Sequence, residues 1–436
     1  MTSTSTPPSQ STAAPHRRWR IAFLLGFGVL IDFFDRVNIS VAHNALLHDF
    51  HITELTFGVL ASAYAWTYAV LQVPIGVLLD RFGVKVIGRI SSLLWSLASF
   101  LGAIAPGIGT FFAARLLLGV GEASVFPANS KATGYWFPEN ERSFATSFFD
   151  AAAKLASAIG VPILGLVLLR YGWRWTFAFT GFVSLAFFLV FWSVYRNPSQ
   201  DPHLSAEEKR ILRDGNAQPE DLTRTRHGAP LLYLMRQRGV IGSSIGFAAY
   251  NYTFYLLLTW LPTYLSQSLH INLLHSVLYT SVPWGIATLT DLFIGGWLVD
   301  FLVHRGFTPW KVRQTVLCLG MACGAGIFGA SYAHTATQAL FWISLSIGGL
   351  GAMAPVGWSI PSFIAPNESV GRVGGIMNFL TQIAAISAPI ITGYFAGRHN
   401  YSGAFLVAAI ILAIGIAAYL FLLGPMHVIP EPDTAQ

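Results

Sequence analysis

The stretch GVLLDRFGVK (residues 76–85) interrupts a long apolar sequence with glycines and charged side chains. It contains the pattern Gly-x-x-x-Asp, and GWLVDFLVHRG (residues 296–306) repeats this pattern further along the chain. A second pair of matching stretches follows in the same order, FPENERS…VPILG (137–165) and APNESVG…APIITG (365–393). A sequence that echoes itself over these distances predicts two equivalent halves with a binding site where they meet.

The composition is that of a polytopic membrane protein. The chain has 436 residues, of which 54% are hydrophobic and only 11% are charged, against roughly 25% charged in soluble domains. We distinguish about twelve apolar segments, each long enough to cross about 30 Å of hydrocarbon at about 1.5 Å per residue. They are residues 21–42, 55–79, 86–105, 109–131, 143–168, 175–195, 239–266, 276–303, 314–333, 337–362, 373–396 and 402–424.

The basic residues concentrate in one set of alternate loops. Of the 26 Lys and Arg, most lie in the N-terminal segment and in every second loop, whereas the opposite loops carry only Arg170, Arg174 and Arg398. This asymmetry predicts that both termini are cytoplasmic, and it explains the net charge of +6 without nucleic-acid binding. Because Cys318 and Cys323 are the only cysteines, we expect neither a disulfide framework nor a metal site, and we expect no cofactor.

The longest polar stretch divides the chain. We predict a disordered cytoplasmic tail (1–20), an N-terminal six-helix bundle (21–195), a cytoplasmic linker (196–238), a C-terminal six-helix bundle (239–424) and a cytoplasmic tail (425–436). Within the linker, Ser205 and Glu208 have the spacing of a helix N-cap and its N3 partner. The fold class is therefore an all-α membrane protein with twelve transmembrane helices in two pseudo-symmetric bundles.

The loop motif and several helices resemble a known family. GVLLDRFGVK, with Asp80 and Arg81, is similar to the loop signature of the major facilitator superfamily, in which we expect these charges to serve pairing or gating. The stretches DRVNISVA (35–42), SAYAWTYAVLQVPIG (62–76), ARLLLGVGEASVFPANS (114–130) and GGIMNF (374–379) resemble its anion:cation symporter family. The resemblance implies a transporter of sugar acids or other carboxylates that co-transports protons.

Ionisable residues inside the first span suggest the chemistry. Asp32, Asp35 and Arg36 lie on one face of a helix, since residues three and four apart are neighbours. Arg36 can hold a carboxylate with two parallel hydrogen bonds. A carboxylate that loses its cationic partner in a low-dielectric site favours the protonated form, so an anion that occupies Arg36 promotes proton binding. The alternative is a structural Asp32–Arg36 pair that only neutralises itself.

Further site residues follow from the resemblance. It implies that Asp35 and Glu122 are the protonatable acids, with Asp32 assisting, and that Arg36 binds substrate. Arg115, two turns before Glu122, is the expected counter-charge, although a purely structural Glu122 is the alternative. The resemblance also implies substrate contacts from one tyrosine and one asparagine, and we add neighbouring polar and aromatic side chains; the set is Tyr68, Asn378, Gln382 and Trp358.

The fifth span departs from the sugar-acid pattern. Ala153 stands where the resemblance implies a substrate-binding glutamine, Lys154 follows it, and Asp150 precedes Lys154 by one turn. Asp291 lies on the eighth span, which commonly faces the fifth in this fold. Lys154 is therefore a second cation for substrate, a gating partner of Asp291, or a neutralising partner of Asp150.

The sequence predicts a secondary active transporter and not an enzyme. We expect it to import an organic anion with protons by alternating access, as a monomer in the lipid bilayer of a bacterial inner membrane. A facilitative uniporter or an exporter of small organic acids is the alternative. A membrane-embedded receptor or sensor is a more distant one, because neither the linker nor the tails could hold an output domain.

Overall fold

The computed structural model describes residues 16–138, 141–217, 220, 229–269, 271, 273–366 and 369–431. These residues are almost entirely helical and include no β-strand. The elements are α1 (Arg17–Val41), α2 (His43–Phe50), α3 (Glu54–Ala103), α4 (Ile108–Glu122), α5 (Val125–Trp136), α6 (Arg142–Tyr171), α7 (Trp173–Val194), η1 (Pro198–Gln200), α8 (Ala206–Asp214), α9 (Leu231–Met235), α10 (Arg238–Ser268), α11 (Leu273–Thr290), η2 (Asp291–Leu298), α12 (Val299–His304), α13 (Pro309–Ala325), η3 (Gly326–Tyr332), α14 (Ala336–Ile364), α15 (Val370–Ala396), α16 (Tyr401–Ala417) and η4 (Ala418–Leu423).

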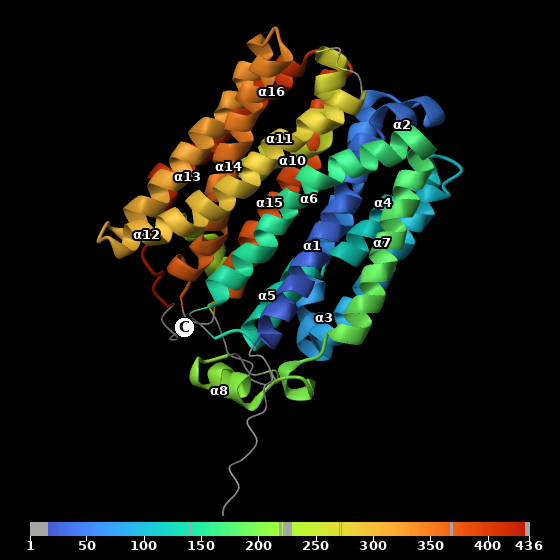
Figure 1. Ribbon diagram of the computed structural model, residues 1–436. Coiled ribbons are helices and arrows are strands. Elements are labelled where there is room, and N and C mark those ends of the chain that lie inside the picture. The colour runs from blue at the N-terminus through green and yellow to red at the C-terminus, as the bar shows by residue number, and fades with distance from the viewer. Residues whose placement is uncertain are drawn as a thin grey trace, which may run out of the picture.

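The helices form two groups that follow the order of the chain. Figure 1 shows α1 to α7, coloured blue to green, beside α10 to η4, coloured yellow to red. We call these the N-terminal half and the C-terminal half. Helix α8 lies across one end of the molecule, which we call the linker end, and α2 lies at the opposite end, which we call the α2 end.

The repeated Gly-x-x-x-Asp motifs end in equivalent turns. Helix α3 contains two of the predicted spans, and the chain reverses between them at Gly83, whose φ is 74°. In the other half, Gly306 follows α12 with a φ of 93°. Only glycine adopts such angles at little cost, since it has no Cβ. The two turns are therefore the backbone counterpart of the repeat seen in the sequence.

The outer surface is apolar along most of the helix length. Val70 and Phe421 are 74% and 79% exposed, respectively, as expected for side chains that face lipid. Among the described residues, nine helical segments are both long and apolar enough to span a membrane. The other three predicted spans fall in α1, the first part of α3 and α10, which carry more ionisable, hydroxyl and aromatic residues.

The linker is attached to the start of α1. Arg17 forms an ion pair of 2.7 Å with Asp201, and Arg18 contacts both Glu141 and Glu208. The side chain of Ser205 accepts a hydrogen bond from the main chain of Glu208, which caps α8 as the sequence predicts. These ion pairs extend α1 back to Arg17, inside the predicted disordered tail; residues 1–15 of that tail lie outside the described residues.

The two halves contact each other at the α2 end through polar groups and backbone. Gln267 of α10 donates a hydrogen bond of 3.0 Å to Glu54 of α3, and the hydroxyl of Tyr401 donates to Gln267 at 2.8 Å. The other carboxylate oxygen of Glu54 lies 2.6 Å from His43. Gly58 lies so close to the carbonyl of Pro389 that a side chain there would collide with it. The α2 end is closed.

Within the N-terminal half, glycines bring α4 close to α3. A Cβ at Gly119 would overlap the main-chain carbonyl of Tyr64, and one at Gly121 would lie 2.6 Å from the main-chain nitrogen of Trp95. Small residues at such crossings allow the helix backbones to approach and pack. This crossing positions Glu122, the last residue of α4, against the centre of the half.

We expect Gly119→Ala to lower the free energy of unfolding by roughly 1–3 kcal/mol, the usual cost of overpacking. Gly109→Ala, in the same helix, is the matched control, because a Cβ at Gly109 would have no neighbouring atom within 4 Å. The measurement is thermal unfolding of the purified variants in detergent. Equal midpoints for both variants would contradict the tight crossing.

Candidate functional site

A buried arginine forms the centre of the site. The Nε of Arg36 donates a hydrogen bond of 2.9 Å to Glu122 of α4, and its Nη2 lies 2.9 Å from the carboxylate of Asp32, one turn earlier in α1. Its Nη1 donates to the hydroxyl of Tyr255 in α10 at 3.2 Å. Arg36 is 5% exposed, and both carboxylates are fully buried. We call these four residues the Arg36 cluster.

Aromatic rings surround the guanidinium. Its central carbon lies 4.6 Å from the ring centre of Phe33, 5.2 Å from that of Tyr64 and 5.5 Å from that of Tyr68. Cation–π attraction stabilises the charge there while the rings exclude water. Tyr68, predicted to contact substrate, is thus next to Arg36.

Asp35 occupies a different environment from the other two acids. Its carboxylate accepts hydrogen bonds from Ser99 of α3 and from Ser184 of α7, the second at 2.8 Å. Arg115 donates to the main-chain oxygen of Asp35 at 3.0 Å, and its Nε and Nη2 have no hydrogen-bond partner among the described residues. The counter-charges of Arg36 are therefore Asp32 and Glu122, whereas Asp35 faces the interior of the N-terminal half.

A second buried cation links the two halves. The ammonium of Lys154 in α6 lies 2.7 Å from the carboxylate of Asp150, one turn earlier, and 2.7 Å from that of Asp291. Asp291 begins η2, a π-helical stretch in the C-terminal half. Lys154 is 2% exposed and Asp291 is fully buried. Two of the predicted pairings of Lys154 thus occur together, and we call these three residues the Lys154 triad.

The other predicted substrate contacts lie toward the linker end. Asn378 of α15 donates to Gln72 of α3 at 2.7 Å, and Gln382 donates to Asn378 at 3.2 Å. Trp358 of α14 stacks on Phe126 of α5, with ring centres 6.4 Å apart. The Asn378–Gln72 and Trp358–Phe126 contacts join the two halves, so the Arg36 cluster is closed from the linker end as well as from the α2 end.

Residues 25–389 match the model of the Major Facilitator Superfamily. The protein belongs to this superfamily. It is 38% identical to the uncharacterized transporter YybO of Bacillus subtilis (strain 168), over 94% of each chain. It is 30% identical to the D-galactonate transporter of Escherichia coli O6:H1, over 96% of this chain and 98% of that one.

Solved structures agree on the fold. A bacterial homologue of the human lysosomal transporter Spinster, in an inward-facing and unoccupied conformation, superposes with a TM-score of 0.73 at 15% identity, over 95% of this chain and 98% of that one. The prediction of an all-α membrane protein with the twelve transmembrane helices of the major facilitator fold is confirmed. The predictions that the protein is a transporter and that it is not an enzyme are confirmed too, and the receptor alternative is rejected.

The acid of the superfamily's loop motif pairs within its own half. Asp80 forms an ion pair of 2.5 Å with Lys131 of α5. Lys131 also donates to the main-chain oxygen of Leu79 at 3.0 Å. Arg81 lies over the ring of Phe82 at 5.2 Å. Asp80 thus takes part in a charge pair in this conformation, with a lysine of α5 as its partner.

Sequence reasoning missed three hydroxyl groups of the site. Tyr255 contacts Arg36, and Ser99 and Ser184 hold Asp35. Uncharged hydroxyls are common in apolar helices and do not stand out there. The only signal was the tyrosine-rich stretch AAYNYTFYLLL (residues 248–258) in the seventh span.

Proposed function

We propose that this protein is a secondary active transporter that imports an organic carboxylate together with protons by alternating access. The observation that carries the proposal is the Arg36 cluster, in which one guanidinium is shared by two fully buried carboxylates and a single hydroxyl from the other half. Such a cluster has one more carboxylate than it has cations. It can therefore exchange a carboxylate partner for an anionic substrate if it also takes up a proton.

The exchange follows from the hydrogen-bonding geometry. Arg36 uses Nε for Glu122 and Nη1 for Tyr255, and its guanidinium offers five N–H donors in a rigid fork. A substrate carboxylate that enters the cluster competes with Glu122 and displaces the weaker hydroxyl of Tyr255. Glu122 without its cation then favours the protonated form, which couples anion and proton binding.

Asp35 is the second proton-binding group of the proposal. Ser99 and Ser184 satisfy its carboxylate with hydrogen bonds, and Arg115 approaches the same residue through the main chain. The two unused donor atoms of Arg115 allow it to turn toward a nearby carboxylate. Asp32, paired with Arg36 in the same helix, supplies counter-charge when no anion is bound.

A sugar acid is the substrate class that the polar lining favours. Tyr68, Asn378 and Gln382 supply hydroxyl and amide groups that can pair with the hydroxyls of a polyol chain. The amide pairs Asn378–Gln72 and Gln382–Asn378 satisfy each other in this closed structure. Relatives named as D-galactonate and probable galactarate/D-glucarate transporters support this class.

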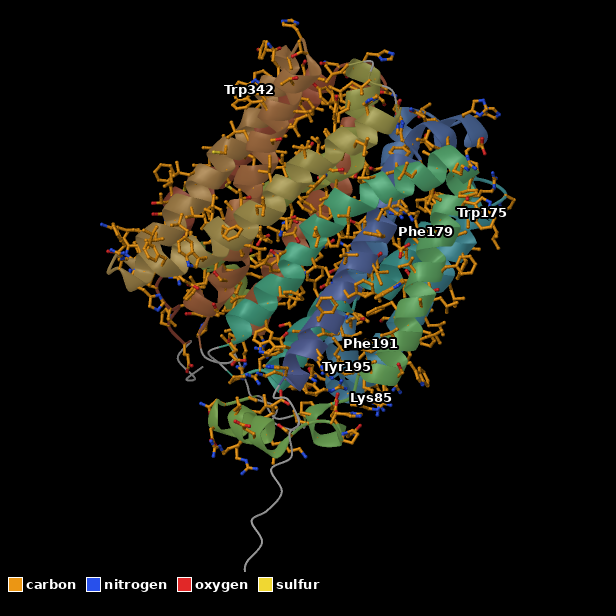
Figure 2. All side chains as sticks on the ribbon, viewed as in Figure 1. Lys85, Trp175, Phe179, Phe191, Tyr195 and Trp342 are labelled. Carbon is orange, nitrogen blue, oxygen red and sulfur yellow. The ribbon has the colours of Figure 1, made fainter. Side chains whose placement is uncertain are left out.

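We place the protein, as a monomer, in a bacterial inner membrane with the linker end in the cytoplasm. Figure 2 shows Lys85 near the linker end and Trp175 and Trp342 toward the opposite end. Lys85 donates to Gln200 of the linker at 3.0 Å, and two arginines of α1 form ion pairs with linker carboxylates. Basic residues gathered at one end favour the cytoplasmic side.

This topology predicts opposite labelling of two exposed positions. In a background with Cys318 and Cys323 replaced by serine, His48→Cys lies on α2 and Lys209→Cys on α8, both exposed. We expect a membrane-impermeant maleimide added to intact bacterial cells to label only His48→Cys, and to label both after permeabilisation. Labelling of Lys209→Cys in intact cells would reverse the proposed orientation.

Arg36→Lys should weaken anion binding by tenfold or more, about 1.4 kcal/mol. The reason is that an ammonium cannot replace the two parallel hydrogen bonds of a guanidinium. Thermal stabilisation of the purified protein by D-galactonate and by galactarate measures the affinity. Arg20→Lys is the matched control, since Arg20 is exposed on the same helix; if Arg36→Lys bound these anions as Arg20→Lys does, the anchor would lie elsewhere.

Glu122→Gln and Asp35→Asn should each remove accumulation driven by a pH gradient and leave anion exchange partly intact. The variants keep the shape of the side chains but cannot bind and release a proton. Uptake and counterflow in proteoliposomes measure both activities, with Glu207→Gln on the exposed side of α8 as the control. Proton-independent equilibration by the wild type would indicate a uniporter, and proton-driven efflux an exporter.

A further inference from the structure

The Lys154 triad has the same design as the Arg36 cluster. In each, an aspartate precedes the cation by one turn of the same helix, and a second acid comes from another helix. Each therefore holds two carboxylates around one cation. The difference is that Glu122 belongs to the same half as Arg36, whereas Asp291 belongs to the half opposite Lys154.

The triad is not electrically balanced in its fully buried state. If both carboxylates are ionised, the group carries one net negative charge where Lys154 is 2%, Asp150 is 7% and Asp291 is 0% exposed. Neither carboxylate oxygen of Asp291 has a hydrogen-bond partner among the described residues, so its charge is offset only by the nearby ammonium of Lys154. Burying an uncompensated charge is costly. One bound proton makes the triad neutral.

In the described part of the chain, the helices around the triad place no further charge beside it. The titratable groups that face Asp291 are Lys154 and Asp150 of α6, and α10 adds the neutral phenol of Tyr250 beside the ammonium. A small cavity next to Lys154 is lined by Tyr250, Phe254, Trp284, Leu350 and Gly351. Among the described residues, α14 contributes only apolar groups to that cavity.

The triad lies between the Arg36 cluster and the linker end. Tyr250, next to Lys154, precedes Tyr255, next to Arg36, by five residues in α10, and α10 begins at the linker end. At about 1.5 Å per residue, the triad is displaced toward the linker end by roughly 7 Å. Its ion pair between Lys154 and Asp291 must break before the halves can separate there.

We propose that the Lys154 triad is a proton-binding site of its own, separate from the Arg36 cluster, that releases its proton when the halves part at the linker end. In the closed structure the proton is shared between Asp150 and Asp291 around Lys154. When the halves separate, Asp291 leaves the ammonium and meets water. The O–H bond of its carboxyl group then breaks, the proton passes to water, and Lys154 and Asp150 remain as a neutral pair on α6.

Substrate binding by Lys154 fits the triad less well. Its ammonium already donates a hydrogen bond to Asp150 and lies 2.7 Å from the carboxylate of Asp291. A substrate carboxylate added there would bring a third negative group to one ammonium. The triad can accept a proton without rearrangement, and it can accept an anion only after both aspartates have been displaced.

Infrared difference spectroscopy of the purified protein tests the site without any substrate. We expect Asp291→Asn and Asp150→Asn each to remove the carbonyl band of one protonated carboxyl group per protein. In either variant the one remaining carboxylate is balanced by Lys154, so it has no need of a proton. Asp300→Asn, exposed and in the same transmembrane segment, is the matched control and should keep the band. Two variants guard against failure of either one to fold. Persistence of the band in both would overturn the proposal.

The second measurement is the proton-to-anion ratio, and it rests on the proposed proton-coupled uptake. The ratio is obtained from the D-galactonate gradient at which net flux in proteoliposomes stops. We expect Asp291→Asn to transport one proton fewer per anion than the wild type. An unchanged ratio in Asp291→Asn would contradict the release step. If the wild type showed no proton-coupled uptake, the proposed function would fail while the infrared result still decided the triad.

Discussion

The burial of Arg36 between Asp32 and Glu122 is the interaction on which the centre of this protein depends. A charge at the middle of a bilayer costs on the order of 2.5–3.5 kcal/mol by insertion scales, so the guanidinium and its two carboxylates are tolerated there because opposite charges lie in contact. Glu122 reaches this position because α4 packs closely on α3, which the glycines at 119 and 121 allow. Tyr255 then brings α10, and with it the other half, to the same cation.

The polar contacts between the halves are distributed along the molecule. Glu54 with Gln267 lies near the α2 end, and Gln72 with Asn378 lies toward the linker end. Hydrogen bonds of this kind contribute about 1 kcal/mol each because water can replace either partner. Conformations that open one end or the other can therefore lie within a few kcal/mol of the closed one, as alternating access requires.

The Arg36 cluster and the Lys154 triad differ in which halves of the protein supply their charged residues. The Arg36 cluster takes all its charged groups from one half, so its ion pairs do not depend on how the halves lie relative to each other. The Lys154 triad spans both halves, so it cannot lose Asp291 without a change of conformation. In the proposed function, similar local chemistry thus supports ligand binding in one place and a link to conformation in the other.

The sequence by itself determined the features that depend on neighbouring residues. The apolar spans, the repeated turns at Gly83 and Gly306, the cap at Ser205 and the pairs Asp32–Arg36 and Asp150–Lys154 all follow from local periodicity and spacing. It also limited the partners of Lys154 to a short set of alternatives. These predictions succeed because a helix fixes which residues three and four apart share a face.

Only the tertiary structure decided which distant side chains meet. It assigned Glu122 rather than Asp35 to Arg36, and it enclosed Asp35 with serines from α3 and α7. It brought Tyr255 to the guanidinium and Lys131 to Asp80. Contacts of this kind depend on the rotation and crossing of helices far apart in the chain, which are set by packing and not by spacing along the sequence.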